Sequence, residues 1–206
     1  MLPAKFLNAA KDKIVIASGN EGKVREIGSM LSSLGFEIIA QQRLGISSVP
    51  ETGATFRENA LIKARHAAAK SGLPAIADDS GLVVDALGGR PGVHSARYAG
   101  KNASDEENVD KLLAELQGVA AGKRGAHYEC AAVWLSPDAS IAPLIAEGQW
   151  HGCVIDERRG DGGFGYDPVF LDLEMNMTGA EMSIEEKNRQ SHRGKAFRQL
   201  RELLSQ

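Results

Sequence analysis

KIVIASGNEGK, at residues 13–23, decides the fold class of this chain. Its β-branched apolar run at 13–17 predicts a short strand, which the turn formers at 18–20 end. Apolar residues then recur three or four positions apart from Val24 to Leu34, which predicts an amphipathic helix that Gly35 ends. The chain therefore opens with a strand followed by a helix, as α/β proteins do.

The rest of the chain continues to alternate short apolar runs with helical spacing. The predicted strands are at 37–40, 75–77, 82–85, 128–135, 141–146 and 169–171. The predicted helices are at 55–71, at 104–116 after a Ser-x-x-Glu capping box, and at 191–204 after a capping Ser191. We expect the strands at 128–135 and 141–146 to form a hairpin, and 88–100 to form an extended loop. These elements predict one α/β domain with a mixed sheet over residues 13–206, and residues 1–12 as an N-terminal extension.

Composition excludes several classes of protein. Of 206 residues, 43% are hydrophobic and 25% are charged, which are ordinary values for a folded domain. The net charge is 24 − 27 = −3, so the chain has no overall positive field to attract nucleic acid. Two cysteines, Cys130 and Cys153, are too few for a disulfide framework or a zinc site. No 18-residue apolar run and no secretory signal are present, so we expect a soluble cytoplasmic protein without a membrane span.

The first candidate site is the turn Ser18-Gly19-Asn20-Glu21-Gly22-Lys23. Its glycines let the backbone approach a ligand, and the N–H groups that begin the next helix favour a phosphate, with Lys23 adding charge. The turn is not a Walker A loop, because the lysine is followed by valine. An ordinary strand-to-helix turn with a surface lysine would have the same sequence.

The second candidate is the pair Asp78-Asp79 with Glu51 on an earlier loop. Magnesium takes one or two carboxylates and leaves its other positions to water and phosphate oxygens. Adjacent residues of an extended chain point to opposite faces, so we expect one aspartate to face the ligand and the other to support the turn. The alternative is that the segment 78–81 is a structural turn only.

Two further candidates lie in the last third of the chain. Lys187 and the segment Ser191-His192-Arg193-Gly194-Lys195 place cations where they oppose the dipole of the last helix, a conflict that a bound anion would resolve. A solvated basic face is the alternative. The segment from Gly162 to Pro168 flanks Phe164 with glycines, so that Phe164 could stack on a nucleobase and Asp167 could accept hydrogen bonds from it. A tight loop whose aromatics fill the core is again the alternative.

Taken together, these motifs resemble those of the Ham1/RdgB family of inosine triphosphate pyrophosphatases, from about Lys13 to the end of the chain. The segments that carry the resemblance are SGNEGK (18–23), ETGATFRENALIKA (51–64), ADDSGL (77–82), GRPGVHSARYAG (89–100), GGFGYDPVF (162–170) and EEKNRQSHRGKA (185–196). The resemblance implies a long mixed sheet with helices on its faces, two lobes that enclose a cleft, and a homodimer. It implies hydrolysis of ITP, dITP and XTP to the monophosphate and pyrophosphate, with Mg²⁺ as cofactor.

The resemblance also assigns roles to matching positions. Asp79 would be the general base and a metal ligand, and Glu51 the other metal-associated carboxylate. Residues Ser18, Gly19, Asn20, Glu21, Gly22 and Lys23 would bind the triphosphate. The remaining substrate-binding positions would be Ser80, Phe164, Gly165, Tyr166, Asp167, Lys187, His192 and Arg193.

Three other functions stay open at this stage. The first is a Maf-like pyrophosphatase for other nucleotides, which a panel of substrates would distinguish. The second is a nucleotide-binding module without turnover, although Asp79 and Glu51 argue against it because binding alone has less need for a base and a metal. The third is RNA binding through the basic C-terminal helix, which the net charge of −3 disfavours.

Overall fold

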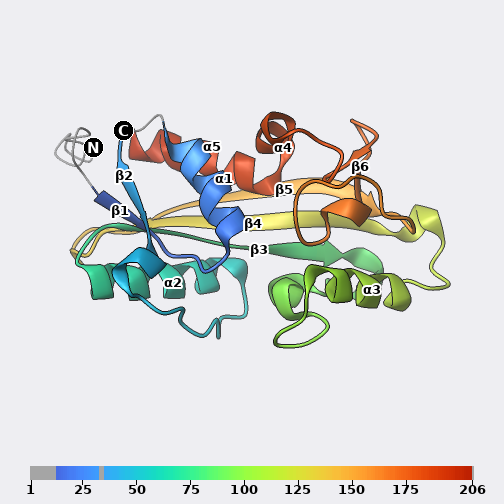
Figure 1. Cartoon of the computed structure of the whole chain (residues 1–206), viewed down its shortest axis with the longest axis horizontal. Coiled ribbons are helices and arrows are strands. Elements are labelled where there is room, and N and C mark those ends of the chain that lie inside the picture. Colours follow the sequence, from blue (N-terminus) through green and yellow to red (C-terminus); the bar gives the residue numbers. More distant parts are fainter. Residues whose placement is uncertain (1–12, 33–34, 206) are drawn as a thin grey trace. The chain divides into compact units, whose positions relative to one another are not determined.

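The computed structural model describes residues 13–32 and 35–205, and the expectations for residues 1–12 and for Leu34 lie outside them. Within this part of the chain, seven strands form one sheet in the order β2-β1-β3-β4-β5-β6-β7 (Figure 1). The strands are β1 Lys13–Ile16, β2 Glu37–Ala40, β3 Ala75–Val84, β4 Gly125–Leu135, β5 Leu144–Val154, β6 Phe170–Asp172 and β7 Met177–Thr178. The α-helices are α1 Glu21–Leu31, α2 Phe56–Ser71, α3 Asp105–Glu115, α4 Ile184–Gln190 and α5 His192–Leu204.

The sheet is mixed, as predicted. Strand β1 runs parallel to both β2 and β3, with Val15 opposite Ile39 and Ala75. Strand β6 is antiparallel to β5 and to β7. Parallel neighbours require helical crossovers, and α1 and α2 are those crossovers.

The chain divides into two compact units. Unit 1 contains the residues up to 79, 130–148 and those from 193 onward, and unit 2 contains 80–129 and 149–192. The division falls inside β3, β4 and β5 and after the first residue of α5. The expectation of two lobes around a cleft stays a prediction.

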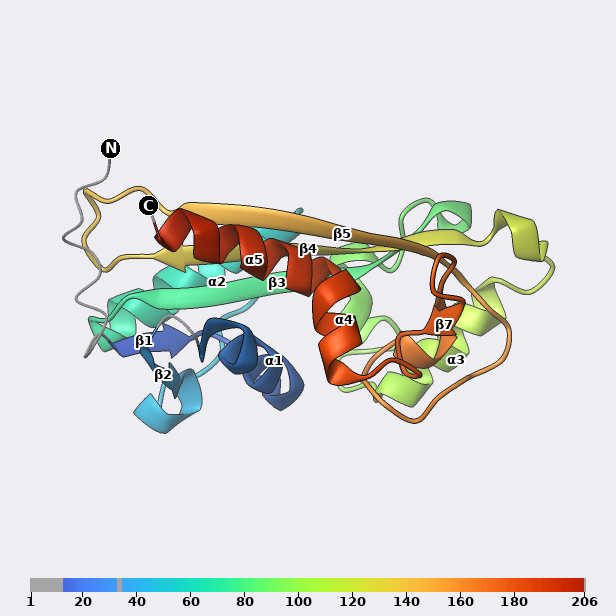
Figure 2. The ribbon, with the colours of Figure 1, turned by 90° about the horizontal axis from the view of Figure 1, so that it is seen from above.

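In unit 1 the sheet is covered on both faces. Helices α1 and α5 lie on one face and α2 lies on the other (Figure 1); Figure 2 shows α1 and α5 from their own side. Strand β1 is therefore apolar throughout its buried part, from Ile14 to Ile16. The apolar stripes of α1 and α5, with Ile27, Leu31 and Phe197, pack into one cluster with β1.

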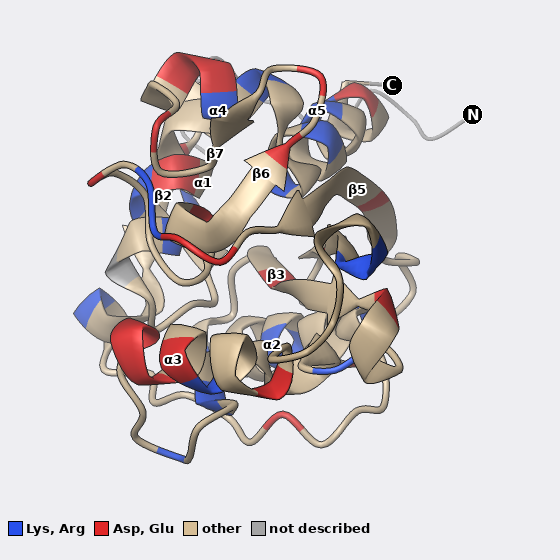
Figure 3. Cartoon of the chain, turned by 90° about the vertical axis from the view of Figure 1, so that its right-hand side faces the viewer, with Lys and Arg blue, Asp and Glu red and all other residues tan. Residues whose placement is uncertain are grey.

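Unit 2 has a core that is richer in aromatic residues. Tyr128, Trp150 and Phe170 pack against one another, and the apolar face of α3 joins the same cluster through Leu112 and Leu116. The predicted capping box of α3 is confirmed, because Ser104 accepts from the backbone of Glu107 while the Glu107 carboxylate accepts from Ser104 N. Figure 3 shows in red the acidic residues that begin α3 and α4, where they complement the helix dipole.

Several predicted elements differ from those of the structure. The expected pair of strands around residues 78–81 is one continuous strand, β3, because the charges of the two aspartates are compensated by cations inside the fold. The expected loop at 88–100 contains a 3₁₀ helix, Gly92–Arg97, and the second hairpin strand begins at Leu144 and ends at Val154. Helix α4 was not predicted at all, although Ser183 and Glu186 form a capping box before it.

Among the described residues, no helix combines the length and the apolar composition needed to cross a membrane.

Candidate active site

The predicted phosphate-binding turn joins β1 to α1 in unit 1. Asn20 is the N-cap of α1, and its Oδ1 accepts from Lys23 N at 3.0 Å. Ser18 Oγ accepts from Asn20 N at 3.2 Å, and Gln42 Nε2 donates to Ser18 O at 2.9 Å. Gly19 and Asn20 are exposed, so the backbone at the start of α1 is accessible to a ligand. Such a helix start carries N–H donors and a partial positive charge, both of which favour phosphate.

Asp78 lies on the side of β3 that faces α1 and α5. Its Oδ2 accepts from Lys23 Nζ at 3.1 Å and from Arg193 Nε at 3.2 Å, and the side chain is fully buried. Burial alone would raise the pKa of Asp78, but Lys23 and Arg193 hold it far below the ordinary range. Asp78 is therefore a permanently ionised anchor for two cations.

Arg193 is held by two carboxylates at once. It is 2% exposed, and its Nη1 donates to Glu26 Oε2 at 2.6 Å while its Nε donates to Asp78. Burial would lower the pKa of Arg193, but Asp78 and Glu26 outweigh burial and raise it. The predicted conflict between cations and the dipole at the start of α5 is thus resolved for Arg193 by carboxylates of the protein itself.

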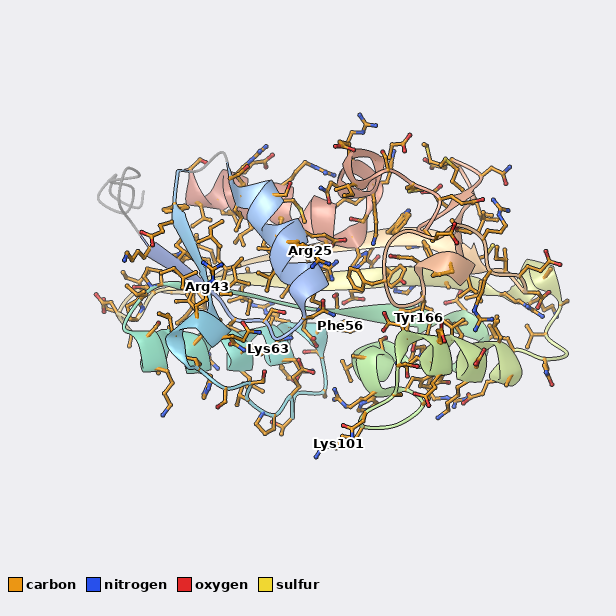
Figure 4. All side chains as sticks on the ribbon, viewed as in Figure 1. Arg25, Arg43, Phe56, Lys63, Lys101 and Tyr166 are labelled. Carbon is orange, nitrogen blue, oxygen red and sulfur yellow. The ribbon has the colours of Figure 1, made fainter. Side chains whose placement is uncertain are left out.

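Asp79 lies on the other side of β3, where its partner comes from α2. Lys63 Nζ donates to Asp79 Oδ1 at 2.9 Å and to Glu51 Oε1 at 2.8 Å, and Figure 4 labels Lys63. Asp79 is 5% exposed, and its Oδ2 has no hydrogen-bond partner among the described residues. Burial raises the pKa of Asp79 despite the opposing charges of Lys63 and Lys23, and Glu51 adds to the rise.

The pKa of Lys63 depends on burial and on three nearby carboxylates. Burial would lower the pKa of the ammonium group, but Asp79, Asp78 and Glu51 together raise it. Lys63 therefore stays charged and holds the two carboxylates of Glu51 and Asp79 together. The expectation that adjacent aspartates take different roles agrees with this geometry, although they lie within a strand and support no turn.

Of the candidate residues whose side chains are described in unit 1, Glu51 and Asp79 fit the predicted metal. Both supply hard oxygen donors, and Asp79 Oδ2 is a buried acceptor with no partner in the described part of the chain. Among the described residues no group of three His, Cys, Asp or Glu side chains could hold a metal ion. Two carboxylates suit an ion that takes its remaining ligands from water and phosphate oxygens, as Mg²⁺ does.

A second cluster, in unit 2, contains the predicted residues Phe164, Asp167 and Lys187. Asp167 Oδ2 accepts from Lys187 Nζ at 2.5 Å and from Phe164 N at 2.8 Å, and Asp167 is 3% exposed. The ammonium of Lys187 also lies 4.6 Å from the centre of the Phe164 ring. Gly163 has a φ of 73°, and a Cβ there would collide with the Asp167 carboxylate, so this turn requires glycine.

The neighbouring positions Gly165 and Tyr166 are held by other contacts. Gly165 N donates to Asp105 Oδ2 at 2.7 Å, and the Tyr166 hydroxyl donates to Ser95 O at 2.8 Å. Tyr166 is buried in the core of unit 2, and burial raises its pKa. Its side chain therefore supports the core, as the alternative interpretation of this loop expects for its aromatics.

His192 and Ser80 complete the predicted set in unit 2. The His192 ring stacks on Tyr128 at 4.6 Å with an interplanar angle of 6°, and on Trp150 at 6.4 Å. His192 is 4% exposed, so the orientation of its ring is set by the aromatic core. Ser80 lies in β3 and is half-buried. Glu21 is the first residue of α1, and its side chain lies outside the described part of the structure.

Three residues that sequence reasoning missed belong to these clusters: Lys63, Glu26 and Tyr128. Lys63 could have been noticed in the sequence, because it is a lysine among the alanines that form the buried face of α2. Glu26 follows Lys23 by three positions, so both lie on the same side of α1. Nothing in the sequence around Tyr128 indicates its contact with His192, which is 64 positions away.

This fold and these clusters define a class: an α/β protein with an accessible helix start after β1 and with the carboxylates of Asp79 and Glu51 joined by one lysine. The model of the Ham1 family matches residues 14–203, so the chain belongs to the Ham1 family, as the resemblance predicted. A dITP/XTP pyrophosphatase of Methylococcus capsulatus is 61% identical over 184 residues, 89% of this chain and 92% of that protein. A dITP/XTP pyrophosphatase of Pectobacterium atrosepticum is 53% identical over 192 residues, 93% of this chain and 98% of that protein.

Solved structures agree with this assignment. A HAM1 protein from Coxiella burnetii superposes with a TM-score of 0.86 at 45% identity, covering 94% of this chain and 98% of that one. The Ham1 protein of Staphylococcus aureus superposes with a TM-score of 0.83 at 39% identity, with the same coverage. The predicted α/β fold with a mixed sheet is confirmed.

Proposed function

We propose that this protein hydrolyses dITP, ITP and XTP to the nucleoside monophosphate and pyrophosphate. The observation that carries the proposal is the buried Asp79 carboxylate, paired with Glu51 through Lys63 and keeping one oxygen without a partner in the described structure. Relatives at 61% and 53% identity, over about nine-tenths of the chain, are dITP/XTP pyrophosphatases.

In this proposal the turn 18–23 binds the triphosphate. The accessible backbone at the start of α1 and the ammonium of Lys23 offset negative charge on the phosphates. Asp78 keeps Lys23 in place, because its own buried negative charge requires a cation. Lys187 and Arg193 add positive charge.

Asp79 acts as the general base. A water molecule attacks the triphosphate, the anhydride bond between the α- and β-phosphates breaks, and the proton of the water passes to Asp79. Burial raises the pKa of Asp79, which makes its carboxylate a better proton acceptor than that of an exposed aspartate.

Glu51 and Asp79 would hold the divalent metal, which we propose to be Mg²⁺. When bound, the ion supplies positive charge that offsets the negative charge of the phosphate oxygens. The protein's own part is to keep two carboxylates side by side in a buried place, and Lys63 does this in the structure described here.

Selectivity for the base would come from the cluster around Phe164 and Asp167 in unit 2. The Phe164 ring would stack on the purine, Asp167 and Lys187 would contact its polar edge, and His192 and Ser80 would contribute further hydrogen bonds. Inosine and xanthosine carry a 6-keto acceptor where adenosine carries an amino donor, so buried donors would be left unpaired by ATP. Unpaired buried polar groups can give discrimination of about 10⁴.

We also propose that the protein works in the cytoplasm as a homodimer. Cys130 and Cys153 are free thiols, as in proteins of reducing compartments. In such a dimer a second copy would cover exposed apolar residues, and Leu173 and Ile184, at 66% and 69% exposed, are candidates. Light scattering after size exclusion measures the mass of the assembly directly, and a mass near 22 kDa would exclude the dimer.

The experiment for the enzymatic activity is a pyrophosphate-release assay with dITP, ITP, XTP, ATP, GTP and dTTP, each with Mg²⁺ and with EDTA. We expect release only with Mg²⁺, and kcat/KM for the first three substrates to exceed that for ATP by about 10²-fold or more. Comparable kcat/KM across the purines would refute the proposed selectivity. Activity confined to dTTP would favour a Maf-like pyrophosphatase, and nucleotide binding without release would favour a binding module.

A further inference from the structure

Asn59 is a buried polar residue on the face of α2 that is otherwise lined by buried alanines. It is 0% exposed, and its neighbours on this face include Ala60 and Ala64. Its Oδ1 accepts from Gly53 N at 2.8 Å, while its Nδ2 has no hydrogen-bond partner among the described residues. A buried amide whose donor is unsatisfied costs free energy that an apolar residue would not, so this side chain calls for a functional explanation.

Gly53 lies so close to helix α2 that its position has no room for a side chain. A Cβ at Gly53 would lie 2.6 Å from Glu58 Cβ and 2.8 Å from Asn59 Oδ1, so only glycine lets the loop approach α2 this closely. The next residue, Ala54, donates from its N–H to Glu58 Oε2 at 2.7 Å, but that bond is exposed to solvent. The bond to Asn59, whose side chain is fully buried, is therefore better shielded from competing water than the bond to Glu58.

Gly53 follows Glu51 by two residues, and Lys63 follows Asn59 by one helical turn. Asn59 thus holds the backbone of the loop that carries Glu51, while Lys63 holds the Glu51 carboxylate against Asp79. Helix α2 makes both contacts from one side. The position of Glu51 relative to Asp79 is consequently set by two side chains of the same helix.

We propose that Asn59 is a positioning residue for the proposed metal site: its carbonyl oxygen fixes the loop 51–54 so that Glu51 lies beside Asp79. The inference rests on the proposed function. Groups that orient metal ligands typically change metal affinity by about 10–100-fold when they are removed. The loss should therefore fall on metal affinity, since Asn59 touches no reacting group.

The test uses Asn59→Leu, which keeps the volume but removes the acceptor, and Gly53→Ala, which pushes the loop away from an intact Asn59. Gly28→Ala is the matched control, because a Cβ at Gly28 meets nothing within 4 Å and lies in helix α1 of the same unit. Circular dichroism and thermal melting establish that each variant is folded.

Two readouts are needed. The first is the Mg²⁺ concentration that gives the half-maximal rate of dITP hydrolysis, which we expect to rise about ten-fold or more in Asn59→Leu and Gly53→Ala, with kcat at saturating Mg²⁺ changed less than about three-fold. The second is the affinity for Mn²⁺, measured from the electron paramagnetic resonance signal of free Mn²⁺ with a non-hydrolysable dITP analogue. It should weaken in parallel, while Gly28→Ala remains close to wild type.

A folded Asn59→Leu or Gly53→Ala with unchanged half-saturating Mg²⁺ and unchanged Mn²⁺ affinity would overturn the inference, as would a loss of kcat alone. If Asn59→Leu does not fold, Gly53→Ala carries the test. A wild-type protein that releases no pyrophosphate from dITP would instead refute the proposed function, and the Mn²⁺ titration would still decide the role of Asn59.

Discussion

Asp78 and Asp79 are adjacent aspartates on opposite sides of β3, and their electrostatic surroundings shift their pKa values in opposite directions. Asp78 accepts from two cations, Lys23 and Arg193, and its pKa lies far below the ordinary range. Asp79 accepts from one lysine that it shares with Glu51, and its pKa is raised by burial. Both are buried to a similar degree, so the number of cations at hydrogen-bonding distance decides between a structural anion and a basic carboxylate.

The largest expected effect separates the two aspartates by activity. Asp79→Asn should lower kcat for dITP by about 10³-fold, because the amide cannot take a proton from water. Binding of a non-hydrolysable dITP analogue should remain measurable by calorimetry, since Lys23 and Arg193 keep their partner Asp78. Near-normal turnover in this variant would remove Asp79 from the role of base.

The second effect concerns the free energy of unfolding, to which we expect Asp78 to contribute strongly. Asp78→Asn leaves Lys23 and Arg193 without their shared negative charge, and breaking a buried ion pair in this way costs about 3–5 kcal/mol of the free energy of unfolding. Urea denaturation of the folded variant measures this loss. Glu37→Gln is the comparison, because the pair Lys13–Glu37 is exposed and should contribute little. Equal, small losses in both variants would mean that the network around Asp78 is not structural.

A smaller effect is expected from unit 2. Phe164→Leu removes the ring that lies over Lys187, and loss of base stacking costs about 1–3 kcal/mol, or about thirty-fold in kcat/KM at the middle of that range. The loss should appear in KM for dITP, in contrast to Asp79→Asn, which should act on kcat. Phe164→Tyr keeps the ring and should behave like wild type. A kcat-only loss in Phe164→Leu would contradict the stacking role.

The smallest effect concerns pH: the charges of Asp78 and Asp79 contribute to the stability of the fold with opposite signs. It is measured on metal-free protein in EDTA. The folded pKa of Asp78 is depressed, so its stabilisation is complete above the unfolded pKa of about 3.9 and is lost as pH falls toward the folded value. The folded pKa of Asp79 is raised, so its charge destabilises the fold at neutral pH, and this penalty disappears below about pH 3.9.

Asp79→Asn removes this unfavourable term but also one of the two carboxylates that hold Lys63, so it should lower the melting temperature at pH 7 by less than Asp78→Asn does, and its difference from wild type should shrink as the pH approaches 4. For Asp78→Asn the melting temperature should be lowered at pH 7, and that deficit should shrink only at still lower pH. Melting curves between pH 3 and 8 test both. Parallel pH dependence in the two variants would show that the two carboxylates do not differ as described.

Local sequence signals account for much of the fold. The strand and helix around residues 13–31, the α2 boundaries and the capping box at Ser104 were predictable, because each depends on residues within one turn of one another. The strand β3 was not, since Asp-Asp-Ser-Gly is a typical turn sequence. Its extended form depends on Lys23, Arg193 and Lys63, which come from three different helices.

The candidate site divides in the same way. By itself the sequence determined the strand-to-helix turn at 18–23, the family and the presence of Asp79 and Glu51, since these follow from residue types and their spacing along the chain. Only the tertiary structure decided that Lys63 joins Glu51 to Asp79 and that Asn59 holds Gly53. Charge–charge and hydrogen-bond energies depend on distance and burial in space, and a linear sequence contains neither until helices and strands pack.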